Sequence, residues 1–295
     1  MATNVFDNIL ELPNSAIAAR REALVGFEPR FVRVHANLKM LLDPDGLKAW
    51  SLKHHHVELP IVGHMADRHP LVILAGDAGT GKTISAEVLS DAIARELGKE
   101  GFFLRLSTRV RGEGLHGQMG NLVNDAFEKV KVEAGKKRLA FLLIDEADAI
   151  ATSRSTLQMH QEEKAAVNTL IQKLDELREL RGRAVVFMST NRMHLLDEAI
   201  VRRAAVVLQF ERPSEEERVE LFQKGLTGLK LTKKELHELA ELTGPDQNDG
   251  LGHSFSDIRL RLIPEAVASC YPDHPLSFAA LKLAAELTRP SPAIQ

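Results

Sequence analysis

Apolar and polar positions over residues 67–211 follow a pattern typical of strands and helices that succeed one another. Near-continuous apolar runs, which indicate strands buried on both faces, cover Leu71–Ala75, Phe102–Ser107, Leu139–Ile144, Ala184–Ser189 and Val206–Phe210. Between these runs, apolar residues recur at helical spacing over Ile84–Leu97, Asn121–Glu133 and Glu163–Leu180. The alternation predicts an α/β domain in which helices cover both faces of a parallel sheet, a three-layer αβα arrangement.

The pattern changes at residue 212, because only helical periodicity remains from there on. Two capping boxes predict helix starts, at Ser214 with Glu217 and at Thr232 with Glu235. Two further helical patterns cover Ser256–Ala268 and Ser277–Leu287. We therefore expect residues 212–295 to form a small α-helical lid domain.

Residues 1–66 alternate short apolar stretches with turn signals and predict a short N-terminal segment, not a separate domain. His54-His55-His56 lies in this segment. Because three consecutive side chains point in different directions and no second ligand group is nearby in sequence, we interpret it as a solvated turn, not a metal site.

The strongest motif follows the apolar run Leu71–Ala75 and has the spacing G-x-x-x-x-G-K-T. It consists of Gly76, Asp77, Ala78, Gly79, Thr80, Gly81, Lys82 and Thr83. Glycines let backbone N–H groups surround phosphate oxygens, and the start of the following helix adds partial positive charge. Lys82 is expected to reach the β- and γ-phosphates and the Thr83 hydroxyl to bind Mg²⁺. The motif thus predicts binding of a nucleoside triphosphate with Mg²⁺.

Two carboxylates follow the strand Leu139–Ile144, at the edge of the sheet where ligands of such folds bind. Asp145 is expected to hold Mg²⁺ through water. Glu146 is placed to take a proton from the water that attacks the γ-phosphate. Asp148, in contrast, is interpreted as a first-turn residue that complements a helix dipole.

Three further sets of side chains complete the predicted chemistry. Asn191, after the next apolar strand, is expected to orient the attacking water. Arg202 and Arg203 precede the last strand, and an arginine supplied by a neighbouring subunit can stabilise charge on the γ-phosphate. Arg259 and Arg261 lie two apart on a lid helix, so they cannot both face the nucleotide.

Composition narrows the function classes. A formal net charge of -3, with 44% hydrophobic and 27% charged residues, gives no overall basic field that would suggest a nucleic-acid partner. No apolar run reaches the roughly 20 residues that span a bilayer, and Met1–Leu12 carries acidic residues, so we expect a cytoplasmic protein. The single cysteine, Cys270, is expected to be a small core residue on a helix. No guanine-reading motif is present, which favours ATP.

In their order along the chain, these motifs resemble those of an AAA+ ATPase over residues 71–268. Within that class the chain is most similar to the pachytene checkpoint protein 2 / thyroid receptor-interacting protein 13 family, whose bacterial members accompany HORMA-domain proteins in CBASS antiphage systems. The short stretches that carry this likeness are Gly120–Val123, Ala166–Leu170, Val201–Ala204 and Arg261–Pro264.

The resemblance implies a hexameric ring that pulls on a HORMA-domain protein, which can be in complex with a nucleotidyltransferase, and remodels it with ATP energy. By position, the substrate-gripping pore loop would be Leu115, His116 and Gly117, where eukaryotic relatives carry aromatics. The resemblance also points to Arg203 rather than Arg202 as the arginine finger. The Ser-Gly-Arg of the relatives corresponds to Ser256-Asp257-Ile258, so the sensing arginine of the lid is left open between Arg259 and Arg261.

Three hypotheses from different classes follow. The first is an ATP-hydrolysing protein remodeller. The second is a DNA-linked AAA+ loader or initiator, which calls for a basic face or an appended DNA-binding module. The third is a nucleotide switch with slow turnover, against which Glu146 argues. ATP turnover measured with DNA and with a HORMA partner separates the three.

Overall fold

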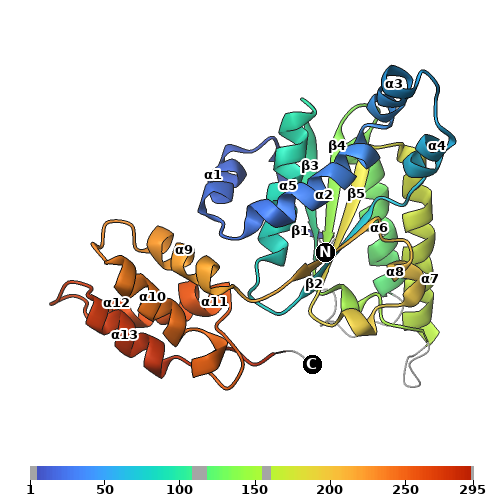
Figure 1. Cartoon of the computed structure of the whole chain (residues 1–295). Helices are drawn as coiled ribbons and strands as arrows, with labels where there is room; N and C mark the ends of the chain where they lie inside the picture. Colours follow the sequence, from blue (N-terminus) through green and yellow to red (C-terminus); the bar gives the residue numbers. More distant parts are fainter. Residues whose placement is uncertain (1–4, 108–117, 155–160, 294–295) are drawn as a thin grey trace. The chain divides into compact units, whose positions relative to one another are not determined.

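The computed structural model describes residues 5–107, 118–154 and 161–293 and divides into two compact units (Figure 1). The first unit comprises the chain up to Glu22, Pro29–Ala75 and Thr83–Gln209. The second comprises Ala23–Glu28, Gly76–Lys82 and the residues from Phe210 onward. The chain therefore passes from one unit to the other within the predicted phosphate loop. The domain boundaries expected at residues 66 and 211 stay a prediction.

A six-stranded sheet forms the centre of the first unit. Its strands are β1 (Phe6–Leu12), β2 (Leu71–Gly76), β3 (Gly101–Leu106), β4 (Leu139–Ile144), β5 (Ala184–Thr190) and β6 (Val206–Phe210), in the order β1-β3-β4-β5-β2-β6. All five strands expected from apolar runs are present, and β3 with β4, β4 with β5, and β2 with β5 pair in parallel. The α/β fold class is confirmed.

One strand corrects the expectation of a wholly parallel sheet. β1 pairs antiparallel with β3, so the sheet is mixed. A register shift between Phe6 and Asn8 breaks the alternation of buried and exposed residues that would have indicated a strand. The N-terminal segment thus supplies an edge strand to the sheet.

Helices lie on both sides of the sheet. In the first unit the chain also forms α1 (Ser15–Ala23), α2 (Phe27–Leu42), α3 (Pro44–His55), α4 (Pro60–Ala66), α5 (Lys82–Glu96), α6 (Gln118–Ala134), α7 (Gln161–Glu176) and α8 (Glu198–Val201). Figure 1 shows α2 and α5 on the side of the sheet away from α6 and α7. Residues of α6 and α7 share one apolar core with alternate residues of β2, β4 and β5. None of the described helices is long and apolar enough to span a membrane.

The opposite face of the same strands is equally buried, which explains their continuous apolar sequence. Phe141 of β4 and Phe187 of β5 are fully buried, and their ring centroids lie 6.3 Å apart. Side chains alternate between the two faces of a strand, so a strand covered on both faces needs an apolar residue at every position.

The three consecutive histidines differ from the expected solvated turn. His54 and His55 belong to the last turn of α3, and His56 caps that helix in the left-handed conformation. The helix starts at Asp43, whose side chain accepts a hydrogen bond from the N–H of Gly46. All three histidines are exposed, so solvation was expected correctly and the local structure was not.

The lid of the second unit is helical, as predicted. It contains α9 (Glu215–Gly225), α10 (Lys233–Leu242), α11 (Phe255–Asp257), a π-helical turn η6 (Ile258–Leu262), α12 (Ile263–Ala268) and α13 (Phe278–Leu287) around one apolar core. Both predicted capping boxes are confirmed: the Ser214 hydroxyl accepts from Glu217 N at 3.2 Å, and the Thr232 hydroxyl accepts from Glu235 N at 3.3 Å.

Two details of the lid differ from the sequence expectations. The helix expected over Ser256–Ala268 contains the π-helical turn, because Pro264 has no N–H to donate to the carbonyl of Leu260. Cys270 lies beyond the end of α12 and is half-buried, so it is not a core residue on a helix. Pro272 follows two residues later, where the chain cannot continue the helix.

An ion-pair cluster between α6 and α7 predicts a pH dependence of stability. Lys131 and Lys173 donate to Glu176 at 2.8 and 3.0 Å, and these hydrogen bonds lower the pKa of Glu176 to about 2. A carboxylate with a lowered pKa stabilises the fold above its unfolded pKa, and that stabilisation is lost as the pH falls from about 4.5 toward 2. We expect Glu176→Gln to cost about 1 kcal/mol at pH 7 and progressively less below pH 4.5.

Melting temperatures of wild type and Glu176→Gln between pH 7 and pH 3 measure this effect. Glu179→Gln is the matched control, since Glu179 is exposed near the end of the same helical segment. A difference between wild type and Glu176→Gln that stays constant with pH contradicts the assignment.

Candidate active site

The phosphate loop takes a backbone path that leaves no room for a side chain at two positions. Gly76 has φ +144°, and a Cβ there would lie 1.9 Å from the carbonyl oxygen of Phe210. Gly79 has φ +74°, and its Cβ would lie 2.7 Å from the Ser254 hydroxyl. A side chain is therefore excluded at both positions by conformation and by space. Gly76 is the first glycine of the motif, whereas Gly79 occupies one of its variable positions; the second motif glycine, Gly81, has φ +93°.

Lys82 lies at the end of this loop and is bound to it. Its Nζ donates to the carbonyl oxygens of Gly76 and Asp77 at 2.7 and 2.6 Å. The Thr80 hydroxyl donates to the same Asp77 carbonyl at 2.7 Å. The ammonium group is thus held over the loop that is expected to surround the phosphates, where a phosphate oxygen can replace a carbonyl as its partner.

The predicted magnesium ligands lie together in the first unit. Thr83 Oγ1 donates to Asp145 Oδ2 at 3.1 Å, and Asp145 directly follows β4. Ser189, on β5, donates to the other carboxylate oxygen of Asp145. A hydroxyl and a carboxylate at this separation form an oxygen donor set that suits Mg²⁺, so these residues fit the ion that the motif implies.

Arg105 is a site residue that the sequence reasoning missed. It lies on β3, and its Nη2 donates to Asp145 Oδ2 at 2.8 Å, the atom that also accepts from Thr83. The signal was a single charged residue within the otherwise apolar run Phe102–Ser107. A charged residue within an apolar strand is a candidate for an ion pair, and the partly exposed Arg105 forms one with Asp145.

Glu146 is exposed and has a positive φ of 49°. This conformation is uncommon for a residue with a side chain and directs the carboxylate differently from an extended chain. Its N–H donates to Asp145 Oδ1 at 3.1 Å. Glu146 therefore follows the metal ligand directly and is accessible to solvent, as a proton acceptor for water must be.

Asp148 lies in a first turn, as expected, but the turn is not part of a helix long enough for the expected dipole role. It lies in a three-residue 3-10 turn, Ala147–Ala149, which is too short for a sizeable dipole. Its Oδ1 accepts from the Thr190 hydroxyl at 2.7 Å and so links the end of β4 to the end of β5. Asn191 follows Thr190 directly and is half-buried. Because β4 and β5 are parallel neighbours, Glu146 and Asn191, which come just after their carboxyl ends, lie at the same edge of the sheet.

The two predicted arginines at the end of α8 differ in their surroundings. Arg203 donates to both carboxylate oxygens of Asp175, at 2.7 and 3.0 Å, while Arg202 is exposed and pairs with Glu198 at 2.9 Å. The hydrogen bonds from Arg203 lower the pKa of Asp175. An additional hydrogen bond, between His69 Nε2 and Asp175 Oδ1 at 2.8 Å, lowers the same pKa further. In the described chain, Arg203 is thus held by a residue of its own subunit and is not brought to Asp145.

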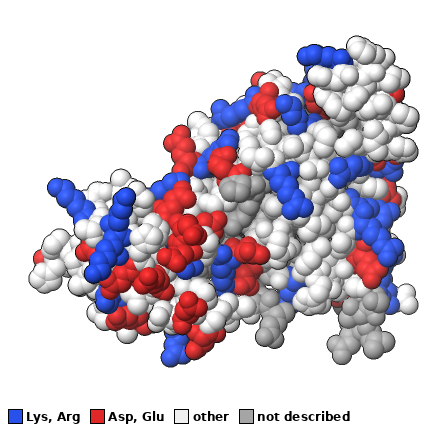
Figure 2. All heavy atoms as spheres, viewed as in Figure 1, with Lys and Arg blue, Asp and Glu red and all other residues white. Residues whose placement is uncertain are grey.

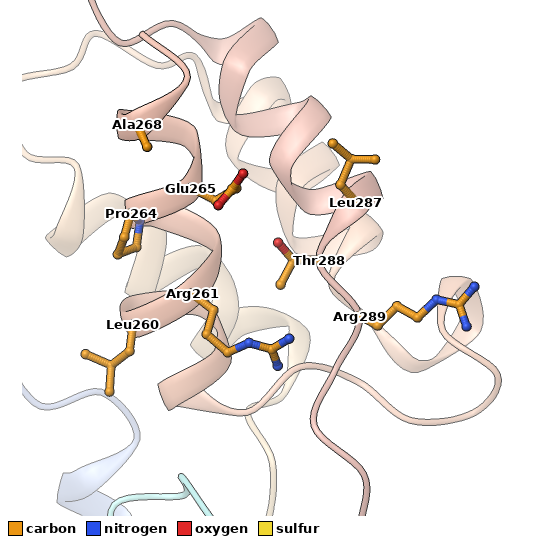
Figure 3. A pocket seen from close by; sticks show the side chains of 8 residues that line it. All are labelled: Leu260, Arg261, Pro264, Glu265, Ala268, Leu287, Thr288 and Arg289. Atoms are coloured by element: carbon orange, nitrogen blue, oxygen red, sulfur yellow. The ribbon is translucent and has the colours of Figure 1, made fainter. Parts of the chain in front are cut away.

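The lid arginines also have separate partners. Arg259 donates to the carbonyl of Ala23 at 2.7 Å, and Arg261 donates to Asp257 at 3.0 Å. Arg261 of η6 lines a pocket of about 710 Å³ together with residues of α12 and the end of α13, and Figure 3 shows its side chain there. Their assignment as nucleotide sensors stays a prediction.

The expected pore loop, Leu115, His116 and Gly117, lies outside the described residues.

Comparisons with known proteins agree with this geometry. The model of the ATPase family associated with various cellular activities (AAA) matches residues 72–212. CD-NTase-associated protein 6 of Escherichia coli (strain KTE188) is 45% identical over 291 residues, which cover 98% of this chain and 97% of that protein.

Solved structures are similar over the same length. Trip13 in the HORMA:CdnC:Trip13 complex of E. coli MS115-1 matches with a TM-score of 0.91 and 38% identity, covering 98% of this chain and 97% of that chain. Rhizobiales Trip13 matches with a TM-score of 0.76 and 33% identity, covering 97% and 99%. The likeness therefore includes the N-terminal segment and the lid.

Proposed function

The chain belongs to the family of CD-NTase-associated protein 6, a Trip13-like group of AAA+ ATPases, and from this membership we propose that it is an ATP-driven remodeller of a HORMA-domain protein in a CBASS antiphage system. The observation that carries the proposal is similarity over almost the full length to a Trip13 solved together with HORMA and CdnC. The same neighbour supports a HORMA protein, in complex with a nucleotidyltransferase, as the partner.

The residues of the site fit the hydrolysis of ATP. Bound Mg·ATP supplies the γ-phosphoryl group and the metal charge that makes it reactive. Lys82, which donates to loop carbonyls in this structure, would donate to phosphate oxygens instead, and the Thr83 hydroxyl and Asp145 carboxylate, which lie in contact, would hold the metal. Glu146 accepts a proton from the attacking water, and the amide of Asn191 orients that water.

The proposed coupling of hydrolysis to remodelling needs more than one subunit. We propose a homo-oligomer, most simply a hexameric ring, in which Arg203 of one subunit reaches the γ-phosphate bound by its neighbour. Leu115, His116 and Gly117 are proposed to contact the substrate in the pore. The full-length likeness to Trip13 supports this assignment.

The alternative classes have less support. A DNA-linked loader calls for a basic surface, whereas Figure 2 shows Lys and Arg interspersed with Asp and Glu over the described residues of the face in view. A slow nucleotide switch would not need an accessible glutamate directly after the metal ligand, which this chain has at Glu146.

A substrate-trapping experiment tests the proposal. A Glu146→Gln variant with ATP is used as bait in extract of the native cells, and we expect a HORMA-domain protein and a nucleotidyltransferase to be retained. Glu146→Gln combined with Lys82→Ala is the control, since it lacks the phosphate-binding ammonium and should retain neither. ATP turnover that rises with DNA and not with the HORMA protein would instead support the loader hypothesis.

A further inference from the structure

The phosphate loop contains an acidic side chain whose charge is unfavourable for its ligand. Asp77 is the second residue of the loop, and its carboxylate lies in the same segment whose backbone is expected to surround phosphate oxygens. Like charges at short range repel, and the repulsion is large where water is scarce. A cation beside Asp77, in addition to Lys82, therefore favours the binding of a triphosphate by this loop.

Arg212 supplies that cation within the same unit. Its Nε donates to Asp77 Oδ2 at 2.8 Å. Both side chains are largely shielded from water, with 11% of the Arg212 side chain and 19% of the Asp77 side chain exposed. Pairs shielded to this degree are screened by salt much less than surface pairs, so the neutralisation persists at physiological ionic strength.

The remaining donors of Arg212 fix its position. Nη1 donates to the carbonyl of Gly252 at 2.7 Å, and Nη2 donates to the carbonyl of Ser291 at 2.7 Å. The guanidinium is planar and rigid, so partners on three sides determine its place and its orientation. Arg212 thereby connects the phosphate loop to the C-terminal segment that follows α13.

Asp257 in turn fixes Ser291. The Asp257 side chain is 2% exposed and accepts from Ser254 N at 2.9 Å, from Ser291 N at 3.2 Å and from the Ser291 hydroxyl. Burial alone would raise the pKa of Asp257, but the hydrogen bonds from Ser291 and Ser254 outweigh it and hold the pKa far below its usual range. Through these hydrogen bonds, Asp257 anchors the segment that carries the Ser291 carbonyl.

We propose that Arg212 is a positioning residue that neutralises Asp77 and holds the phosphate loop in its binding conformation, and that the segment at Ser291 acts on nucleotide affinity by fixing Arg212. The inference rests on the proposed nucleotide binding by Gly76–Thr83. Under this proposal, the C-terminal segment changes the affinity of the phosphate loop for its nucleotide.

Titration of the full-length protein with fluorescent N-methylanthraniloyl-ADP and Mg²⁺ tests this. Arg212→Met is expected to weaken binding about 10- to 100-fold, the range of coupling between charged groups in contact. Asp77→Asn is expected to tighten binding severalfold, and the double variant to recover most of the lost affinity, because the repulsive charge is gone. Lys230→Met, which removes an exposed positive charge from the same unit outside that segment, is the matched control and should bind as wild type.

A second pair of variants tests the C-terminal segment. Ser291→Ala is expected to weaken binding about threefold, and Arg212→Met with Ser291→Ala to bind no more weakly than Arg212→Met alone, because Ser291 acts through Arg212. Ser269→Ala, at an exposed serine of the same unit, is the control. Additive losses, or no loss for Ser291→Ala, overturn the role of the segment.

The outcomes also separate this inference from the proposed function. If the wild type does not bind the nucleotide, the proposed function fails. If the wild type binds and Arg212→Met binds equally well, only the role of Arg212 fails. Arg212→Lys, which keeps the charge, should retain more affinity than Arg212→Met, and a melting temperature within a few degrees of wild type shows that each variant is folded.

Discussion

Replacing Glu146 with Gln is expected to slow ATP hydrolysis by about 10²- to 10⁴-fold, the usual contribution of a positioned proton acceptor. Glutamine is nearly isosteric with glutamate but cannot take a proton from water. Asp145, whose carboxylate is held by Thr83 and Ser189, is left intact, so Mg·ATP should remain bound. Single-turnover hydrolysis and fluorescent-nucleotide binding measure the two effects separately.

The matched control for this variant is Glu179→Gln, which changes charge by the same amount at an exposed position of the same unit. Its turnover should equal that of wild type. Unchanged turnover in Glu146→Gln removes Glu146 from the role of base, whereas loss of nucleotide binding assigns the residue to the binding of Mg·ATP.

The strands that carry the site could be predicted because a strand buried on both faces has an apolar residue at nearly every position. Every residue of β4 is fully buried, so the sequence of this strand is continuously apolar. Asp145, the predicted metal ligand, is the first residue after the strand. The phosphate loop was equally predictable, since its motif places one glycine at Gly76, where a side chain would collide with the backbone of Phe210, and another at Gly81, which has a positive φ.

The parts that could not be predicted depend on contacts between distant residues. Arg105 and Asp145 are 40 residues apart, and only the pairing of β3 with β4 brings them together. The edge strand β1 was missed because its buried and exposed residues do not alternate. Arg212 followed the last predicted strand without any motif, and its contact with Asp77 joins residues 135 positions apart.

Arg203→Ala is expected to reduce hydrolysis by the assembled protein about 10³- to 10⁵-fold, the contribution of an arginine finger, while an isolated subunit binds nucleotide as before. Within the described residues, Arg203 donates hydrogen bonds to Asp175 and to Ala199, neither of which is a predicted metal ligand. Nε and Nη2 bind Asp175, and Nη1 donates to the carbonyl of Ala199 at 3.0 Å. The guanidinium must therefore exchange these partners, or share them, when it meets a neighbour's γ-phosphate.

Mixing two inactive variants tests action across the subunit boundary. Arg203→Ala keeps its own phosphate loop, and Lys82→Ala keeps its own Arg203, so a mixed oligomer contains junctions in which both groups are intact. We expect partial recovery of ATP turnover at equal proportions, and a smaller loss for Arg202→Ala, whose side chain is exposed and paired on its own helix. If mixing restores no turnover although the two variants co-assemble, Arg203 acts within its own subunit, and its bidentate pair with Asp175 is then structural.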